Sequence, residues 1–297
     1  MAGVLVVGES LIDVVERPDG STVEHAGGSA ANVAVALGRL GRPVEFLTAF
    51  GDDARGAALA RHLNQSAVGL VGDPHTLDHT ATARASLAGD GSATYTFEIE
   101  WRLGELPDLA PVVVHACSIG AVMAPGATDV RRLVERLRPH ATVSYDVNAR
   151  PAVTGNGPEV VRAVEDVVVL ADLVKASDED LEALYPGEPV EQAVDRLLGL
   201  GPGAVVVTRG RHGATWYGVG GRVDTAAVEA DVADTIGAGD TYGAGLIDGL
   251  WGLDALGGRL SGLQAAEIDE VLRHAARAAA VTVSRPGADP PYRHELL

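Results

Sequence analysis

The chain is short of cysteine and of long apolar runs. Its 297 residues include one cysteine, Cys117, so an internal disulfide is impossible and a reducing cytosol is the expected environment. The chain starts with a short apolar run and no basic leader, which predicts a first strand and not a signal peptide. No apolar stretch approaches the roughly 20 residues that span a bilayer. We therefore expect a cytoplasmic protein without a membrane partner.

Positive charge is scarce as well. The formal net charge is −18, which argues against nucleic acid or an anionic membrane as a partner. Only one of the 23 basic residues is a lysine, Lys175, and such an excess of arginine is typical of a GC-rich genome. Lys175 has no glycine at the spacing of a P-loop, which excludes a Walker-type ATPase. Cysteine pairs and a His-Glu-x-x-His sequence are absent, so no zinc site is predicted.

Short apolar, β-branched runs alternate with longer segments of helical periodicity. The short runs predict strands at residues 4–7, 45–50, 112–116, 142–145, 173–174 and 204–207. The longer segments predict helices at residues 30–40, 55–63, 129–137, 159–170, 179–184, 190–198 and 264–284. This alternation is typical of a mostly parallel sheet with helices on both faces. We predict one three-layer α/β/α domain over residues 1–297.

The stretch Asp234-Thr-Ile-Gly-Ala-Gly-Asp240 is the part of the sequence that says most about function. Gly237, Ala238 and Gly239 have almost no side chain, so their backbone N–H groups can face one point. The apolar run that follows places them at a helix N-terminus, where free N–H groups and the helix dipole favour an anion. Asp240 comes next, and a carboxylate beside an anion hole suits proton removal from a hydroxyl that attacks a bound phosphoryl group. The stretch predicts a phosphotransfer site.

Two simpler interpretations compete with this one. Gly-x-Gly also occurs in dinucleotide-binding folds, but there a buried strand precedes the glycines, and residues 229–235 are too acidic for one. The second alternative is a glycine-rich helix start without a ligand.

Residues 14–25 and 80–101 break the strand–helix alternation. Each is expected to form two strands, joined by turns at residues 17–21 and 89–92. The last arm alternates polar residues with four apolar ones, which are Tyr95, Phe97, Ile99 and Trp101. One interpretation is a β-extension packed on its own core. We favour a small lid whose apolar face covers a ligand or a second subunit, because a phosphotransfer site must exclude water.

A second motif, Ala26-Gly-Gly-Ser-Ala-Ala-Asn32, precedes a predicted helix. Gly27 and Gly28 let the backbone approach a ligand, Ser29 is a candidate helix cap, and Asn32 offers a donor and an acceptor to vicinal hydroxyls. Together with the stretch that ends at Asp240, this motif resembles the paired signatures of the ribokinase-like (PfkB) carbohydrate kinases. The resemblance runs in order along essentially the whole chain. It implies a ribokinase-like, Rossmann-like three-layer fold with a small β-sheet lid.

The resemblance also implies roles for the sugar and phosphoryl residues. Asp13, Gly27, Gly28 and Asn32 match sugar contacts in the family. Asp240 matches the catalytic base, and the turn of Gly237, Ala238 and Gly239 matches the anion hole. The segment Tyr145-Asp-Val-Asn-Ala-Arg-Pro151 is similar to one in fructokinases and 2-keto-3-deoxygluconate kinases, which adds Asn148 and Arg150 to the substrate site.

Nucleotide and metal residues follow from the same resemblance. The nucleotide positions are Lys175, Ser177, Thr208, Gly210, Gly213, Gly239 and Gly287. Ser177 and Asp180 stand where the family commonly has Asn and Glu, and Asp180 is expected to hold Mg²⁺ through water. Backbone oxygens of related kinases often bind a monovalent cation such as K⁺, and the matching positions are Asp234, Ile236, Ser284 and Gly287.

These observations favour an ATP-dependent kinase of a sugar primary hydroxyl, most simply a ketohexose such as fructose. Alternatives are a 2-keto-3-deoxygluconate kinase, a ribokinase, or a catalytically silent sugar-binding relative. Arg150 suits a phosphate, a substrate carboxylate or a structural ion pair, and Arg84 and Arg102 are further candidates for an acidic sugar. Small sheets of related kinases often pair, so the resemblance also implies a homodimer through the lid.

Overall fold

The structure, a computed structural model, describes residues 3–87, 93–106 and 108–296. Within this part of the chain, a central sheet has the order β13-β12-β11-β10-β9-β8-β1-β4-β5. The seven strands β11, β10, β9, β8, β1, β4 and β5 of this sheet run parallel, while β12 is antiparallel to both β11 and β13. The strands are β1 Val4–Val7, β4 Val44–Leu47, β5 Val68–Leu70, β8 Val113–Cys117, β9 Thr142–Asp146, β10 Leu173–Ser177, β11 Ala204–Thr208, β12 Ala214–Gly218 and β13 Val223–Thr225.

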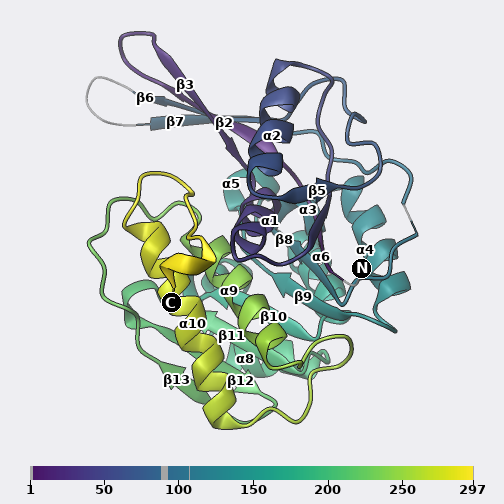
Figure 1. The fold of residues 1–297 in the computed structure, drawn as a ribbon, viewed down its shortest axis with the longest axis vertical. Helices are drawn as coiled ribbons and strands as arrows, with labels where there is room; N and C mark the ends of the chain where they lie inside the picture. Colours follow the sequence, from purple (N-terminus) through teal and green to yellow (C-terminus); the bar gives the residue numbers. More distant parts are fainter. Residues whose placement is uncertain (1–2, 88–92, 107, 297) are drawn as a thin grey trace.

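Helices cover both faces of this sheet (Figure 1), as the sequence predicted. One face packs against α4 (Gly126–Leu137), α6 (Pro158–Val168) and α8 (Val190–Gly199). The other face packs against α1 (Ser29–Arg39), α9 (Ala238–Gly252) and α10 (Ala265–Val283). Shorter or peripheral helices are α2 (Ala54–Gln65), α3 (Ser118–Val122), α5 (Pro151–Thr154), α7 (Asp178–Leu184) and the 3₁₀ turns Gly210–His212 and Arg293–Glu295.

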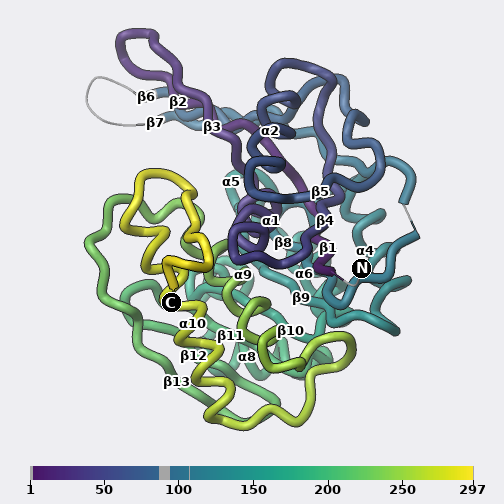
Figure 2. Tube along the Cα trace, viewed as in Figure 1, coloured from purple at the N-terminus to yellow at the C-terminus, as the bar shows by residue number. Residues whose placement is uncertain are grey.

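A second, four-stranded sheet has the order β3-β2-β6-β7 and projects from the body (Figures 1 and 2). Its strands are β2 Leu11–Glu16, β3 Thr22–Gly27, β6 Thr82–Leu87 and β7 Ala93–Glu98. The two segments that break the alternation therefore meet in one sheet, through parallel pairing of β2 with β6. The strands β2 and β3 extend beyond residues 14–25, and the turn predicted at residues 89–92 lies outside the described residues.

The predicted apolar face of the last arm is wrong at its end. Strand β7 stops at Glu98, so Ile99 and Trp101 are not part of the sheet. Trp101 is 1% exposed in the core of the main body, where its Nε1–H donates to the Gly120 carbonyl at 2.8 Å. A buried tryptophan needs a partner for its N–H, and this one finds it in α3 and not in the small sheet.

The two faces of the small sheet differ. On one face Ile12 and Val14 are buried against Phe50 and Leu59 of the body. On the other face, the cross-strand row of Val15, Val23, Ala85 and Tyr95 lies next to the row of Asp13, His25, Ala83 and Phe97. Tyr95 stacks on Phe97 and is 63% exposed. The sheet is thus anchored by one face, while the other carries an unburied apolar surface beside Asp13.

Candidate active site

The glycine turn lies at the N-terminus of α9, as predicted. Gly237 is the N-cap residue with a φ of 74°, a left-handed conformation that favours glycine. A Cβ at Gly237 would lie 2.6 Å from the Ala288 Cβ, so a side chain is also excluded by contact. Asp240 follows in the first turn and is 6% exposed. The helix therefore begins directly beside a buried carboxylate, and of the three N–H groups predicted for the anion hole, that of Ala238 donates to the Thr235 carbonyl at 3.3 Å.

Three neutral donors converge on Asp240 from distant parts of the chain. The Ser29 hydroxyl donates to Oδ1 at 2.7 Å, and the Asn148 amide donates to the same oxygen at 3.3 Å. The Asn32 amide donates to Oδ2 at 2.8 Å. Asn148 also donates to the Ser29 hydroxyl at 2.8 Å. The fold thus brings together the predicted base and two of the predicted substrate contacts.

Ser29 does not cap the helix that follows, contrary to our expectation. The N-cap of α1 is Gly28, with a φ of 100° and no side-chain cap. A Cβ at Gly28 would lie 2.9 Å from the Glu9 carbonyl oxygen, so the close approach of the α1 N-terminus to the segment after β1 requires glycine. The Ser29 side chain is free to reach Asp240 because it sits one position inside the helix.

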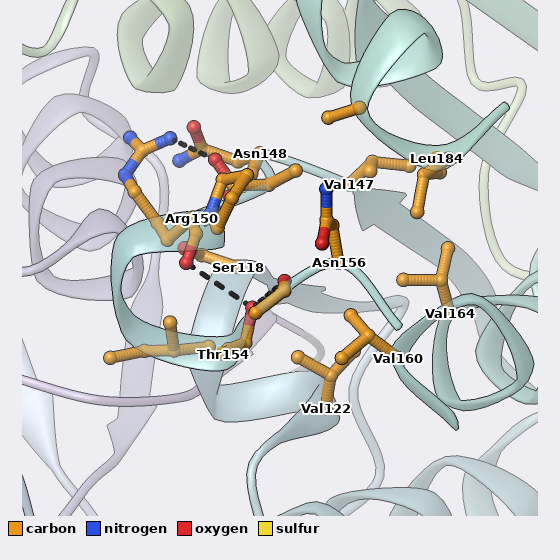
Figure 3. A pocket seen from close by; sticks show the side chains of 15 residues that line it. Ser118, Val122, Val147, Asn148, Arg150, Thr154, Asn156, Val160, Val164 and Leu184 are labelled. Carbon is orange, nitrogen blue, oxygen red and sulfur yellow. Dashed lines mark hydrogen bonds between the residues drawn. The ribbon is translucent and has the colours of Figure 1, made fainter. Parts of the chain in front are cut away.

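The loop after β9 presents Asn148 and Arg150 (Figure 3). Asn148 has a φ of 36°, and hydrogen bonds on both sides hold it there. The Ala149 N–H donates to Asp180 at 2.7 Å, and the Ser118 hydroxyl donates to the Asn148 carbonyl at 3.0 Å. The cavity behind this loop is about 20 Å³, room for about one water molecule. This loop is a rigid support, and the cavity is too small to hold a sugar.

Asp13 lies in β2 against the first glycine of the second motif. A Cβ at Gly27 would lie 2.2 Å from the Asp13 Oδ2, which explains the glycine there. Burial raises the pKa of Asp13, while the charges of His25 and Arg150 oppose that rise. Asp13 therefore packs against Gly27 within range of the Arg150 charge, and its role in binding sugar stays a prediction.

Arg84 and Arg102 have partners away from this cluster. Arg84 lies beside Val14, on the face of the small sheet opposite Asp13, and pairs with Glu16 at 3.5 Å. The Arg102 Nε–H donates to the Thr76 carbonyl at 2.7 Å. Of the three arginines considered for an acidic sugar, only Arg150 has a charge that affects the pKa of Asp13, which burial raises and Arg150 lowers.

Glu9 belongs to the same cluster, although the sequence analysis missed it. Its carboxylate accepts the N–H of Ser29 at 3.2 Å and that of Gly120 at 2.9 Å. Burial, with a smaller contribution from the charge of Asp240, raises the pKa of Glu9 to about 7. The available signal was an acidic residue just after a buried strand, at the sheet edge where α/β folds place ligands.

The nucleotide residues predicted at β10 and β11 lie side by side. Ser177 pairs in register with Thr208 at the carboxyl ends of the two strands. Ser177 caps α7 by accepting the Asp180 N–H at 3.0 Å, and Asp180 accepts the Ser177 N–H at 2.7 Å in return. Lys175 lies deeper and pairs with Asp146 at 2.7 Å.

The turn between β11 and β12 contains Gly210 and Gly213, both with positive φ. A Cβ at Gly213 would lie 2.0 Å from the Thr225 carbonyl oxygen, so close packing on β13 requires glycine there. The turn is therefore a hairpin turn, as the simpler interpretation held. That does not test its proposed contact with nucleotide phosphates.

The segment before α9 is tied to the C-terminal segment. The Asp234 carboxylate accepts the Ile236 N–H at 3.0 Å and the Gly287 N–H at 2.9 Å. Three of the four positions predicted for a monovalent cation are thus adjacent, and Ser284 is the C-cap of α10 nearby. The ion itself stays a prediction.

The described side chains of this site form no cluster that could ligate a metal ion directly. Among the residues that the structure describes, no group of three histidine, cysteine or acidic side chains is placed to hold a metal ion. Both Asp180 oxygens already accept backbone N–H groups, from Ala149 and Ser177.

In the described helices, no segment is long and apolar enough to cross a membrane.

Comparison with known proteins decides the family. Residues 1–295 match the pfkB family carbohydrate kinases. The chain belongs to this family. A fructokinase of Rhizobium leguminosarum bv. trifolii is 32% identical over 279 residues, which cover 90% of this chain and 84% of the relative.

Two solved structures show how similar the fold is across substrates. Aminoimidazole riboside kinase from Salmonella enterica, complexed with aminoimidazole riboside and an ATP analog, has a TM-score of 0.82 at 26% identity, covering 99% of this chain and 98% of its own. A fructokinase double mutant from Vibrio cholerae O395, bound to fructose, ADP and potassium, has a TM-score of 0.79 at 25% identity, covering 97% and 94%. The protein is a sugar kinase, and its substrate must be argued from the site.

Proposed function

We propose that this carbohydrate kinase transfers the γ-phosphoryl group of ATP to a primary hydroxyl of a ketohexose such as fructose. The observation that carries the proposal is the place of Asp240, buried beside the open N-terminus of α9 and contacted by Asn32 and Asn148. The fructokinase relative supports fructose as the first substrate to test.

The chemistry needs one proton transfer and one displacement. Asp240 takes the proton of the sugar hydroxyl as its oxygen attacks the γ-phosphorus. The bond from that phosphorus to the β,γ-bridging oxygen breaks, and ADP leaves with the electron pair. The N–H groups of Gly237 and Gly239 stabilise the charge on the transferred group, because they are fixed before the reaction begins. The Ala238 N–H joins them only if it leaves the Thr235 carbonyl, to which it donates at 3.3 Å.

A neutral sugar fits this site better than an acidic one. Asp13 already places a carboxylate in the sugar region, where burial raises its pKa and the charge of Arg150 opposes that rise. A substrate carboxylate there would meet Asp13 as a like charge. A 2-keto-3-deoxygluconate kinase is the second candidate function, because the guanidinium of Arg150 could pair with the carboxylate of that substrate.

Ions complete the proposal. A divalent ion such as Mg²⁺, bound to the nucleotide phosphates, would neutralise their charge, and Asp180 would hold it through water. Backbone oxygens at Asp234, Ile236, Ser284 and Gly287 would hold K⁺. Replacing potassium by choline at constant ionic strength should lower the rate, and an unchanged rate would remove the potassium site.

A coupled assay of ADP release over fructose, ribose, nucleosides and 2-keto-3-deoxygluconate tests the function. We expect the highest kcat/KM for fructose. A higher value for the keto-deoxy acid would favour the second candidate function. ATP binding without turnover of any sugar would favour a silent sugar-binding relative.

We also propose a homodimer through the small sheet. The row of Val15, Val23, Ala85 and Tyr95 is apolar, and it lies on the same face of the small sheet as Asp13 and Phe97, on which Tyr95 stacks. A second copy of this sheet would bury that surface. Tyr95→Glu should shift sedimentation from dimer to monomer, while Thr96→Glu on the opposite face should not. A wild-type monomer at micromolar concentration would contradict the proposal.

A further inference from the structure

Glu9 is a buried carboxylate that the proposed phosphotransfer does not use. It follows strand β1 and is 3% exposed. Its Oε1 accepts the Ser29 N–H at 3.2 Å, and its Oε2 accepts the Gly120 N–H at 2.9 Å. Ser29 is the first residue of α1, and Gly120 lies in α3. One side chain therefore ties two helices together beside the proposed base.

Close packing fixes the position of this carboxylate. A Cβ at Gly120 would lie 2.6 Å from the Glu9 Oε2 and 2.9 Å from the Glu9 backbone nitrogen. On the side of α1, the backbone at Gly28 approaches the Glu9 carbonyl just as closely. The backbone of both helices closes on residue 9, so a change in its side chain has to be taken up by the helices themselves.

Helix α3 also supports the second donor to the same oxygen of Asp240. The Ser118 hydroxyl, in α3, donates to the Asn148 carbonyl at 3.0 Å. The Asn148 amide and the Ser29 hydroxyl both donate to the Asp240 Oδ1, at 3.3 and 2.7 Å. Both donors are thus held against one short helix, Asn148 through Ser118 and Ser29 through Glu9.

We propose that Glu9 is a positioning residue, which holds the Ser29 hydroxyl against Asp240 and touches no substrate. The inference deepens the proposed function and rests on it, because it takes Asp240 as the base. Without Glu9 the Ser29 N–H would be buried and unpaired, a state that favours a shift of the helix start. A misplacement of about 1 Å in a reacting group costs roughly 10²-fold in rate.

A double-mutant cycle tests whether Glu9 acts through Ser29. Glu9→Gln keeps the shape of the side chain, but its amide nitrogen cannot accept, so one of the two N–H groups loses its partner. Ser29→Ala removes the hydroxyl that reaches Asp240. The third variant carries both changes. If Glu9→Gln unfolds, Glu9→Asp replaces it in the cycle, since it keeps the charge and withdraws the carboxylate by one methylene group.

Asp53→Asn is the matched control. The Asp53 carboxylate also accepts two backbone N–H groups, that of Gly56 at 2.8 Å and that of Thr80 at 2.9 Å. It caps α2, and its hydrogen bonds within the described structure do not lead to Asp240 or to the donors of Asp240. This variant therefore shows what the loss of such a bridge costs when only stability is affected.

Kinetics are measured at about pH 8.5, above the Glu9 pKa of about 7, so that wild type carries the carboxylate. Each single variant should lose about tenfold in kcat, as for a shift well below 1 Å, and keep its KM for sugar and ATP. The double variant should also lose about tenfold, and not the hundredfold that independent effects would give. Asp53→Asn should melt at a lower temperature with the kcat of wild type.

Hydrogen exchange without ligands checks the contact itself. Glu9→Gln should exchange faster than wild type in the peptide that contains Ser29 or in the one that contains Gly120, and Asp53→Asn should do so in neither. Unchanged exchange in both peptides would overturn the contact that the inference requires.

Two kinetic results would also overturn the inference. A folded Glu9→Gln with the kcat of wild type would leave Glu9 a purely structural role. A hundredfold loss in the double variant would mean that Glu9 does not act through Ser29. The cycle uses whichever sugar the coupled assay identifies, so a failure of fructose does not affect it. Normal turnover by Asp240→Asn, in contrast, would end the proposed base and thus the proposed function.

Discussion

Helix α9 carries two buried aspartates about two turns apart, and their surroundings differ in charge. Asp248 is 2% exposed and is contacted by Arg42, by Arg293 at 2.6 Å and by His274 at 2.7 Å. Burial would raise its pKa, but these partners outweigh burial and lower the pKa to about 2. Asp248 is held as a carboxylate, and it ties the loop after α1, helix α10 and the C-terminal segment to α9.

The hydrogen-bond donors to Asp240 are neutral instead. The donors that reach it in the described structure are the hydroxyl of Ser29 and the amides of Asn32 and Asn148. Such donors fix the orientation of a carboxylate without adding a positive charge. One helix therefore uses the same residue type twice, once as a structural anchor clamped by cations and once as a carboxylate oriented by neutral donors, to which the proposed function gives the proton transfer.

Replacement of Asp240 should have the largest effect. Asp240→Asn should lower kcat by roughly 10²–10⁴-fold, because the amide cannot take the proton of the sugar hydroxyl. Sugar affinity and melting temperature should stay near wild type, since Asn keeps the shape and an acceptor. Steady-state kinetics with calorimetry measures both. Retention of more than about a tenth of the wild-type kcat would remove Asp240 from the base role.

Asp248→Asn should show the opposite pattern. Removing this charge leaves partly buried cations unpaired, which should lower the free energy of unfolding by roughly 3–5 kcal/mol. The kcat of the folded fraction should resemble that of wild type. Urea unfolding and kinetics at low temperature provide the two numbers. If turnover fell while stability did not, the contrast between the two aspartates would be wrong.

Glu9 extends the comparison to a third buried carboxylate. Its pKa of about 7 exceeds the ordinary 4.5, so the native state keeps a proton that the unfolded chain loses between these pH values. Stability should therefore fall as the pH rises from 4.5 through 7, by on the order of 3 kcal/mol.

Glu9→Gln lacks this titration, so the difference in unfolding free energy between wild type and variant should change across that window. Asp240 and Cys117 are the titratable groups that face Glu9, and both remain in the variant. Parallel stability curves for the two proteins would show that Glu9 does not titrate there.

Asp13 should give the smallest effect. Asp13→Ala should raise the KM for the sugar by about 10–100-fold, as expected for the loss of hydrogen bonds to a charged group. The KM for ATP should hardly change. Thr96→Ala, on the opposite face of the small sheet, is the matched control. An equal rise in both KM values would contradict a sugar-specific role.

Local signals explain what the sequence predicted correctly. The strands and helices of the body follow from apolar periodicity, and the N-terminus of α9 follows from the glycines before Asp240. The contact of Ser29 with Asp240 joins positions 211 residues apart, and no local pattern encodes such a contact. The prediction that Trp101 lies on the apolar face of the small sheet was wrong for a related reason. The alternation of polar and apolar residues continues in the sequence after strand β7 has ended. The family resemblance supplied the site residues that periodicity cannot give.

Phosphorus NMR of the product formed from ATP and fructose tests the central claim most directly. The account predicts a new phosphate ester whose phosphorus couples to two methylene protons, the pattern of a primary hydroxyl, and no such signal with Asp240→Asn. Inorganic phosphate as the only product, or an ester coupled to a single proton, would contradict it.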